Sequence, residues 1–311
     1  MTSLPLPATE PPAISVRGAV KHFGAVRAVD GIDLDVQPGE VFGLIGHNGA
    51  GKSTLFKMML GLLRPDAGEI RVLGAATRGR GFRAARRGIG YLPENVVLYD
   101  NLTGLETLRF FARLKSAPAA NCAPLLEQVG LAHAAARPVR EYSKGMRQRL
   151  GFAQALLGRP RVLFLDEPTT GLDPEAIRAF HATLAQLRGD GVTIILTSHI
   201  LAELQQRVHR LAILGSGRVR AVGSVSELRE RLQLPLRLEV QFDPGGAAAV
   251  ERALAALPLA QPSWQEGALQ AQLPREAKMP ALAALAALGS TVADLKIHEP
   301  SLEDVFFGVA A

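Results

Sequence analysis

Gly46-His-Asn-Gly-Ala-Gly-Lys-Ser53 is the stretch that decides the fold of this 311-residue chain. It fits the pattern G-x-x-x-x-G-K-[ST], and it lies between an apolar run at Val41–Ile45 and a helical run that starts at Leu55. Glycines in such a loop let consecutive backbone N–H groups face a phosphate, and the helix N-terminus adds a positive dipole. A strand, a phosphate loop and a helix in this order predict an α/β nucleotide-binding domain.

The motif and a second run of residues supply the expected chemistry. Lys52 reaches the β- and γ-phosphates in this motif, and the Ser53 hydroxyl binds Mg²⁺. Val162–Leu165 reads as a buried strand that ends in Asp166 and Glu167, at the edge where parallel sheets bind ligands. Adjacent strand residues point in opposite directions. One carboxylate is therefore expected to face the Mg²⁺, while its neighbour orients a water near the γ-phosphate. The alternative is a strand end with two solvated acids.

The rest of the chain alternates short β-type runs with helical runs, which predicts a largely parallel sheet covered by helices. A helical insertion is expected between Tyr91 and Arg161. Further strands are predicted at Glu69–Leu73, Ile89–Leu92, Thr193–Thr197, Arg210–Leu214 and Arg218–Val222.

Leu234-Pro235 breaks the pattern after a helix that Ser224 and Glu227 begin with capping-box spacing. The predicted domains are a flexible lead-in at 1–13, a nucleotide-binding domain at 14–233 and an accessory α+β domain at 234–311. The tail is expected to contain strands at Leu236–Phe242, Ala268–Leu273 and Thr291–Ile297, a helix at Ala247–Leu257 and a last helix capped by Ser301.

A third segment, Tyr142-Ser-Lys-Gly-Met-Arg-Gln-Arg149, would by itself be only a helix start. Together with the other motifs, it makes the sequence resemble the ATP-binding cassette (ABC) ATPases, whose signature motif precedes the carboxylate-bearing strand by about the distance from Ser143 to Asp166. The resemblance covers residues 14–225 and follows the family's order. It also includes Phe23, Gly90-Tyr-Leu-Pro-Glu94, Gly171-Leu-Asp173 and Thr197-Ser-His199.

This resemblance implies a RecA-like core with antiparallel β and helical subdomains, ATP and Mg²⁺ as cofactors, and ATP hydrolysis as the activity. The nucleotide contacts that it implies are Phe23, Gly46, His47, Asn48, Gly49, Ala50, Gly51, Lys52, Ser53 and Thr54, with Ser143, Gly145 and Asp173 acting across a homodimer interface. The catalytic residues that it implies are Glu167 as general base, His199 as γ-phosphate sensor and Glu94. The Mg²⁺ ligands that it implies are Ser53, Asp166 and Glu94.

Three departures from the family pattern are visible. The signature has Tyr142, Lys144 and Met146 where the commonest pattern has Leu, Gly and Gln. Glu94 stands where the family has Gln, which adds negative charge beside a triphosphate. Phe23 replaces the usual Tyr, keeping the flat ring and losing the hydroxyl.

Composition sets limits on the other function classes. The net charge of +6 is small for this length, and its densest basic cluster has a single aromatic within it, so a nucleic-acid partner is not expected. That cluster is Arg78, Arg80, Arg83, Arg86 and Arg87; it reads as a solvated face, or as a contact with an acidic or lipid-proximal partner. No apolar run approaches the roughly 18 residues of a membrane span. The start of the chain does not resemble a secretory signal, and the lone Cys122 favours a reducing cytosol.

Three stretches, Gly88–Lys115, Tyr142–Gly158 and Ile297–Asp304, look like those of the ATPase subunits of Nos transporters, which serve maturation of the copper enzyme nitrous oxide reductase in denitrifiers. This resemblance implies a homodimer on an integral-membrane permease at the cytoplasmic side of the inner membrane, a periplasmic partner, and a copper- or sulfur-related cargo. Two alternatives remain: the ATPase of another exporter with the same C-terminal extension, and a non-transport ABC ATPase acting on nucleic acid or ribosomes. The latter usually has two cassettes or a long coiled-coil insertion, and this sequence has neither.

Overall fold

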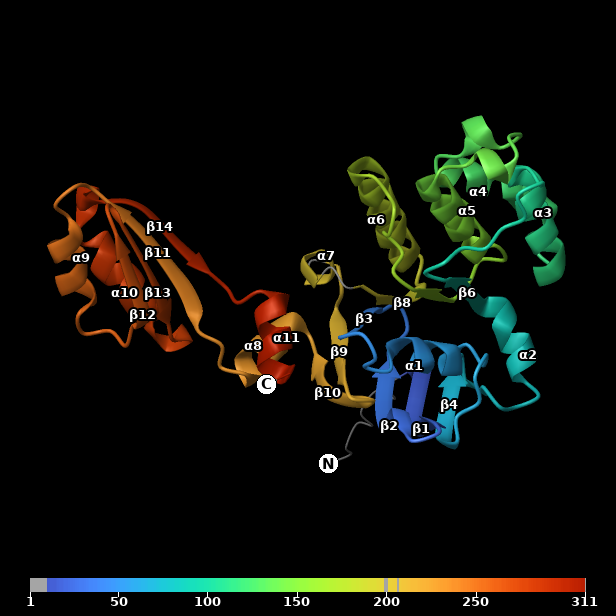
Figure 1. The fold of residues 1–311 in the computed structure, drawn as a ribbon, viewed down its shortest axis with the longest axis horizontal. Coiled ribbons are helices and arrows are strands. Elements are labelled where there is room, and N and C mark those ends of the chain that lie inside the picture. The colour runs from blue at the N-terminus through green and yellow to red at the C-terminus, as the bar shows by residue number, and fades with distance from the viewer. Residues whose placement is uncertain (1–9, 199–200, 206, 311) are drawn as a thin grey trace, which may run out of the picture. The chain divides into compact units, whose positions relative to one another are not determined.

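The computed structural model describes residues 10–198, 201–205 and 207–310. The chain divides into two compact units, Met1–Val222 and Gly223–Ala311. Each unit is described by itself below, with the elements labelled as in Figure 1.

A six-stranded sheet forms the centre of the first unit, in the order β10-β9-β3-β8-β7-β6. These strands are β3 (Val41–Gly46), β6 (Ile89–Leu92), β7 (Val162–Leu165), β8 (Thr193–Thr197), β9 (Arg210–Gly215) and β10 (Arg218–Gly223). The strands from β9 to β6 pair in parallel. Every residue of β7 and β8 is buried, as expected for a parallel sheet covered on both faces. The carboxyl ends of β3, β8 and β7 therefore lie side by side at one edge.

A second, antiparallel sheet in the order β2-β1-β4-β5 belongs to the same unit. Its strands are β1 (Ile14–Phe23), β2 (Val26–Val36), β4 (Ala67–Val72) and β5 (Ala75–Ala76). Helix α1 (Lys52–Met59) shares one hydrophobic core with both sheets, and the Phe56 ring meets the Phe164 ring edge-on with centroids 5.5 Å apart. This packing fixes the direction in which α1 leaves the phosphate loop.

Helices make up most of the chain between β6 and β7, as predicted, and further helices flank this region. They are α2 (Phe82–Ala85), α3 (Gly104–Lys115), α4 (Cys122–Gln128), α5 (Lys144–Leu156), α6 (Pro174–Gly189) and α7 (Leu201–Gln205), with 3₁₀ turns at Arg86–Gly88, Ala119–Asn121, Ala132–Ala134 and Val139–Glu141. Ser143 caps α5 by accepting a hydrogen bond from the backbone N–H of Met146, and Asp173 caps α6 in the same way. The fold predicted for this region, an α/β cassette with antiparallel and helical parts, is confirmed.

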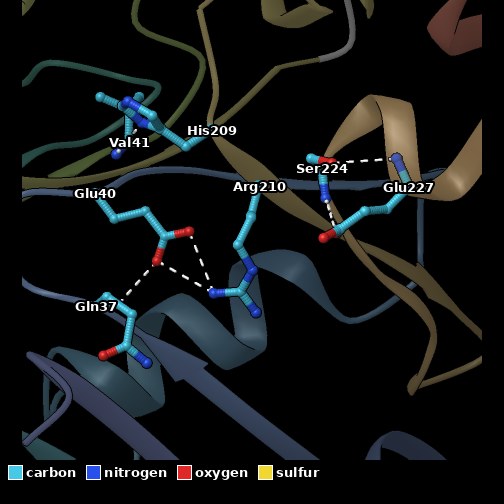
Figure 2. A network of polar contacts seen from close by, with 7 residues as sticks. All are labelled: Gln37, Glu40, Val41, His209, Arg210, Ser224 and Glu227. Atoms are coloured by element: carbon cyan, nitrogen blue, oxygen red, sulfur yellow. Dashed lines mark hydrogen bonds and ion pairs between the residues drawn. The ribbon is translucent and has the colours of Figure 1, made fainter. Parts of the chain in front are cut away.

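The second unit begins with α8 (Val225–Arg231), whose capping box between Ser224 and Glu227 appears in Figure 2. A β-α-β-β-α-β arrangement follows, ending in α11 (Leu302–Ala310). Its elements are β11 (Leu236–Phe242), α9 (Ala247–Leu254), β12 (Ala260–Gln265), β13 (Ala268–Leu273), α10 (Lys278–Ala286) and β14 (Val292–His298). The antiparallel sheet order β12-β13-β11-β14 is that of a ferredoxin-like fold.

One face of this sheet packs against α9 and α10. Alternate residues of β11, from Leu236 to Phe242, are buried in a core with Val250 and Leu254 of α9 and with Leu285 of α10. The strand β12 and the helix α10 were not predicted from the sequence. The contacts within the chain place α8 with the second unit, whereas the sequence assigns this helix to the first domain. The predicted domain boundary between residues 233 and 234 stays a prediction about which part of the chain folds independently.

Candidate active site

A cavity of about 700 Å³ lies at the carboxyl edge of the central sheet. It is lined by Phe23, Val26, Ala28, Asn48, Gly49, Ala50, Gly51, Lys52, Ser53, Thr54, Glu94, Asp166 and Glu167. The strands β3 and β7 bring the phosphate loop and the two strand-end carboxylates to this edge, because only β8 separates them.

The loop between β3 and α1 needs glycine for steric reasons. Gly49 and Gly51 have φ values of 81° and 103°, which side-chain-bearing residues rarely adopt. A Cβ atom on Gly51 would lie 2.3 Å from the Ala28 carbonyl oxygen, and one on Gly46 would lie 2.6 Å from the Leu214 carbonyl oxygen. The motif glycines thus allow the backbone to curl tightly against β2 and β9.

Lys52 is held inside this loop. Its Nζ donates to the carbonyl oxygens of Gly46 at 2.5 Å and of His47 at 3.2 Å. Burial lowers the pKa of the Lys52 ammonium, while the negative charges of Glu167 and Asp166 oppose that shift. Gly46 and His47 are therefore supports for Lys52, and they are not among the residues that line the cavity.

Thr197 organises the two carboxylates, a role that its place in the Thr197-Ser-His199 motif did not indicate. The Thr197 hydroxyl donates to Asp166 Oδ1 at 2.6 Å and accepts from the backbone N–H of Glu167 at 3.0 Å. Thr197 is completely buried, and Glu167 has a φ of 47°, in the left-handed region. The sequence signal that could have indicated this role is a hydroxyl-bearing residue at the end of β8, the strand next to β7. Val26 and Ala28, which form part of the cavity wall, were also missed.

Glu94 and Phe23 face the cavity from two further segments. Burial raises the pKa of the neighbouring Tyr91 hydroxyl, and the negative charges of Asp166 and Glu94 raise it further. Asp166 and Glu94 thus act on one common region of the site. Phe23 is 51% exposed, and the Lys21 ammonium lies 5.6 Å from the centre of its ring.

Ser143, Gly145 and Asp173 are absent from the described residues that line this cavity. A Cβ atom on Gly145 would lie 2.9 Å from the Gly171 carbonyl oxygen, so the starts of α5 and α6 approach each other closely. Within one chain the structure therefore does not bring these residues to the phosphate loop. His199 lies outside the described residues.

A polar network anchors the opposite, amino-terminal ends of β3 and β9 (Figure 2). The Glu40 carboxylate accepts from the Gln37 N–H at 2.8 Å and from the Arg210 guanidinium at 3.3 Å. The Val41 N–H donates to His209 Nδ1 at 3.0 Å. Because Val41 begins the strand that carries the phosphate loop, this network fixes the loop's starting point relative to β9.

Within the described part of the chain, no group of three or more His, Cys, Asp or Glu side chains is placed to hold a metal ion by protein ligands alone. The described helices include none that is long and apolar enough to cross a membrane.

Comparisons with known proteins agree with this geometry. The family described as "ABC transporter" matches residues 29–170. A daunorubicin resistance ATP-binding protein of Streptomyces coeruleorubidus is 38% identical over 307 residues, covering 94% of this chain and 94% of that protein. The Nod factor export ATP-binding protein I of Paraburkholderia xenovorans strain LB400 is 42% identical over 220 residues, covering 70% of this chain and 72% of that protein.

A solved structure titled as the ATP binding subunit of an ABC transporter is similar with a TM-score of 0.66 and 33% identity, covering 70% of this chain and 92% of that one. The phosphate loop, the strand-end carboxylates and the near full-length similarity lead to one conclusion. This chain belongs to the ABC transporter family as an ATP-binding subunit, and its enzymatic activity is ATP hydrolysis coupled to transport.

Proposed function

We propose that this chain binds ATP with Mg²⁺ in the cavity at the sheet edge and hydrolyses it as one half of a homodimer attached to an integral-membrane permease. One observation carries this proposal: the phosphate loop, Glu94, Asp166 and Glu167 line a single cavity. Such sites act mainly by positioning a water and neutralising phosphate charge, and these residues supply both.

The cavity has a phosphate-binding end at the loop before α1 and an aromatic residue, Phe23, for the adenine base. The backbone N–H groups from Asn48 to Thr54 and the Lys52 ammonium surround the triphosphate, as in other phosphate loops. The exposed Phe23 ring stacks on the adenine base, whose flat face needs only a flat partner.

The donor set fits Mg²⁺. The Ser53 hydroxyl and the Asp166 carboxylate line the same cavity, and Glu94 adds a third oxygen donor on another segment. Mg²⁺ prefers oxygen ligands and usually takes only one or two from protein, with phosphate and water supplying the others. When bound, it neutralises charge on the phosphates. Ser53 and Asp166 are proposed as the Mg²⁺ ligands, and His47 is proposed to support Lys52 through its carbonyl oxygen.

Glu167 is proposed as the general base. Its carboxylate accepts the proton of a water whose oxygen forms a bond to the γ-phosphorus, while the bond from that phosphorus to the β,γ-bridging oxygen breaks and ADP leaves. Thr197 holds the Asp166–Glu167 turn that aims the two carboxylates. His199 is proposed as the γ-phosphate sensor.

The second copy of the chain is proposed to complete the site. Ser143 and Gly145 stand at the start of α5, where a helix N-terminus favours a negatively charged γ-phosphate. Neither residue lines the cavity of its own chain. Placing them over the partner's Lys52 gives them a phosphate to bind, and Asp173, at the nearby start of α6, then lies at the dimer interface.

The cargo is proposed to be a copper- or sulfur-related species of the Nos system, with a permease in the inner membrane, this chain on its cytoplasmic side and a periplasmic partner. Support comes from the resemblance of residues 88–115, 142–158 and 297–304. The relatives named for daunorubicin resistance and Nod factor export favour a second candidate, export of an unrelated small molecule. A transport assay separates the two candidates. Vesicles that contain the purified permease complex are tested for ATP-driven accumulation of copper or sulfur species and, in parallel, of daunorubicin.

Glu167→Gln tests the proposed chemistry. The carboxamide keeps the shape of the side chain but cannot accept the proton, so hydrolysis should fall by about 10²–10⁴-fold while ATP binding is retained. The measurement is steady-state ATPase and nucleotide binding of the complex with its permease. Glu251→Gln, on the exposed face of α9, is the matched control and should leave both values unchanged. Near-normal turnover of Glu167→Gln would remove Glu167 from the role of base.

A further inference from the structure

A second, strongly basic cavity of about 530 Å³ lies between α2, the following 3₁₀ turn and the end of α3. Its lining is Arg80, Arg83, Ala84, Arg86, Arg87, Leu114, Lys115 and Ser116. Five of these eight residues carry positive charge, and none of the eight carries negative charge. The segments that meet here are separated by more than twenty residues in sequence, so the fold has gathered this charge from two places.

The positive charges are largely uncompensated. Arg86 is fixed in place, because its guanidinium donates to the Gly61 carbonyl oxygen at 2.8 Å and lies 5.3 Å from the centre of the Phe82 ring. Among the described residues, no carboxylate pairs with Arg80, Arg83 or Arg87. A group of like charges without counterions costs electrostatic free energy, which a bound anion would offset.

Lys115 adds a partly buried cation to the lining of this cavity. Burial lowers the pKa of its ammonium to about 8, and no carboxylate is close enough to oppose the shift. Its methylene chain lies near Gly158, where an added Cβ atom would meet Lys115 Cε at 3.6 Å. The Lys115 side chain is half-buried and is part of the cavity lining.

The lining also indicates the kind of anion. Guanidinium groups present paired N–H donors that match phosphate oxygens, and four of them surround this cavity. Leu114 lies next to Lys115 and is 69% exposed, so an apolar side chain stands beside the cationic groups. Basic residues beside an exposed apolar residue are typical of protein surfaces that contact the headgroup region of a membrane.

We propose that this cavity binds the phosphate of an anionic phospholipid headgroup and holds α2 and the end of α3 against the membrane surface. The membrane as source of the phosphate rests on the proposed function, since a subunit attached to a permease lies within reach of the bilayer. Phosphate recognition itself rests only on the lining residues. An acidic peptide would match the charge and the guanidinium geometry equally well. The exposed Leu114 beside the basic residues favours the membrane surface, where an apolar side chain has a place to insert.

The test is flotation of the full chain with vesicles of phosphatidylcholine alone or mixed with phosphatidylglycerol. Saturating Mg·ADP keeps the phosphate loop occupied throughout. The variant Arg80→Gln/Arg83→Gln/Arg87→Gln removes three exposed charges and leaves the Arg86 contact intact. The control Arg140→Gln/Arg188→Gln/Arg237→Gln removes three exposed charges elsewhere, so both variants have the same net charge.

The wild-type chain and the control should bind the anionic vesicles, and the cavity variant should bind roughly 100-fold more weakly, because each basic residue near an anionic surface contributes about fivefold. Equal binding of the wild-type chain to both kinds of vesicle would overturn the proposal, and so would an equal loss in the control. Two further arms test other occupants. Direct binding of pyrophosphate or of polyglutamate to the wild-type chain, lost in the cavity variant and found without any preference for anionic vesicles, would assign the cavity to a soluble phosphate or to an acidic peptide.

ATPase activity is measured on the same preparations, so that failure of the phospholipid proposal can be distinguished from failure of the proposed ATPase function. None of the three substituted arginines lines the nucleotide cavity, so basal hydrolysis should stay within about twofold of the wild-type rate, as for surface substitutions away from a site. Loss of vesicle binding with hydrolysis intact concerns only the basic cavity, whereas absence of hydrolysis in the wild-type chain would concern the proposed function.

Discussion

Thr197 shows how one buried hydroxyl can organise a catalytic pair. It donates to Asp166 and accepts from the Glu167 backbone, so Thr197→Val removes both hydrogen bonds and keeps the side-chain shape. A lost hydrogen bond to a charged group is worth about 1.5–3 kcal/mol. We expect roughly a 10- to 100-fold fall in hydrolysis and a higher Mg²⁺ concentration at half-maximal rate, measured by ATPase assays across a Mg²⁺ titration.

Thr193, on the same strand, gives the matched control, because its hydroxyl accepts from the Gly39 N–H at 3.0 Å far from the carboxylates. Thr193→Val should lower the stability of the fold without changing the Mg²⁺ dependence of hydrolysis. Thr197→Ser keeps the hydroxyl, so it should show the wild-type Mg²⁺ dependence. Equal Mg²⁺ titrations for both valine variants would show that Thr197 has only a structural role.

Some individual site residues could be predicted from the sequence, and others could not. Asn48 to Thr54, which line the cavity, were predictable because the phosphate loop is a local pattern whose chemistry depends on consecutive residues. The place of Asp166 follows from the end of a buried strand. Thr197 and Ala28 could not be found in this way, since their roles depend on β8 lying between β3 and β7 and on β2 passing beside the loop.

At the scale of whole elements, prediction succeeded where burial imposes a pattern. Alternation in Leu236–Phe242 marks β11 because one face of that strand is buried, and the continuous apolar run of β7 marks a strand buried on both faces. All residues of β12 are exposed, so this edge strand carries no such signal. Helix α10 lies in an alanine-rich stretch that has almost no polar face, and its periodicity is correspondingly weak.

Helix α6 carries a histidine that should make stability depend on pH. Burial and the nearby Arg207 charge lower the pKa of His181 to about 4, whereas an unfolded histidine titrates near 6.5. Between these values the unfolded chain binds more protons than the folded chain, so the free energy of unfolding decreases as the pH falls. The full contribution is present above pH 6.5, and on the order of 3 kcal/mol is lost by pH 4.

Urea denaturation between pH 7 and pH 4.5 measures this loss. His181→Leu should remove most of the pH dependence in that window, whereas His133→Leu, at an exposed site, should keep it. If His181→Leu and the wild-type chain lose stability in parallel, another group is responsible.

For the whole molecule, the two compact units predict that nucleotide binding belongs to the first alone. Every described residue that lines the nucleotide cavity precedes Val222. Chains that end at residue 222 or at residue 233 should therefore bind Mg·ATP within about threefold of the full chain, because they lose no nucleotide contact. The measurement is nucleotide binding by calorimetry, with far-ultraviolet circular dichroism as the folding control. A truncated chain that is folded but cannot bind ATP would contradict this division.

In the proposed mechanism, two chains share each ATP site. In the Glu167→Gln background, saturating Mg·ATP should convert the purified chain from monomer to dimer in analytical ultracentrifugation, and Mg·ADP should not. Adding Ser143→Arg or Lys52→Ala should abolish the dimer, because each removes one half of both sites. A mixture of these two double variants contains one intact composite site and should dimerise again with ATP. A chain that stays monomeric with Glu167→Gln and ATP, or that dimerises equally well with Ser143→Arg, would contradict the claim.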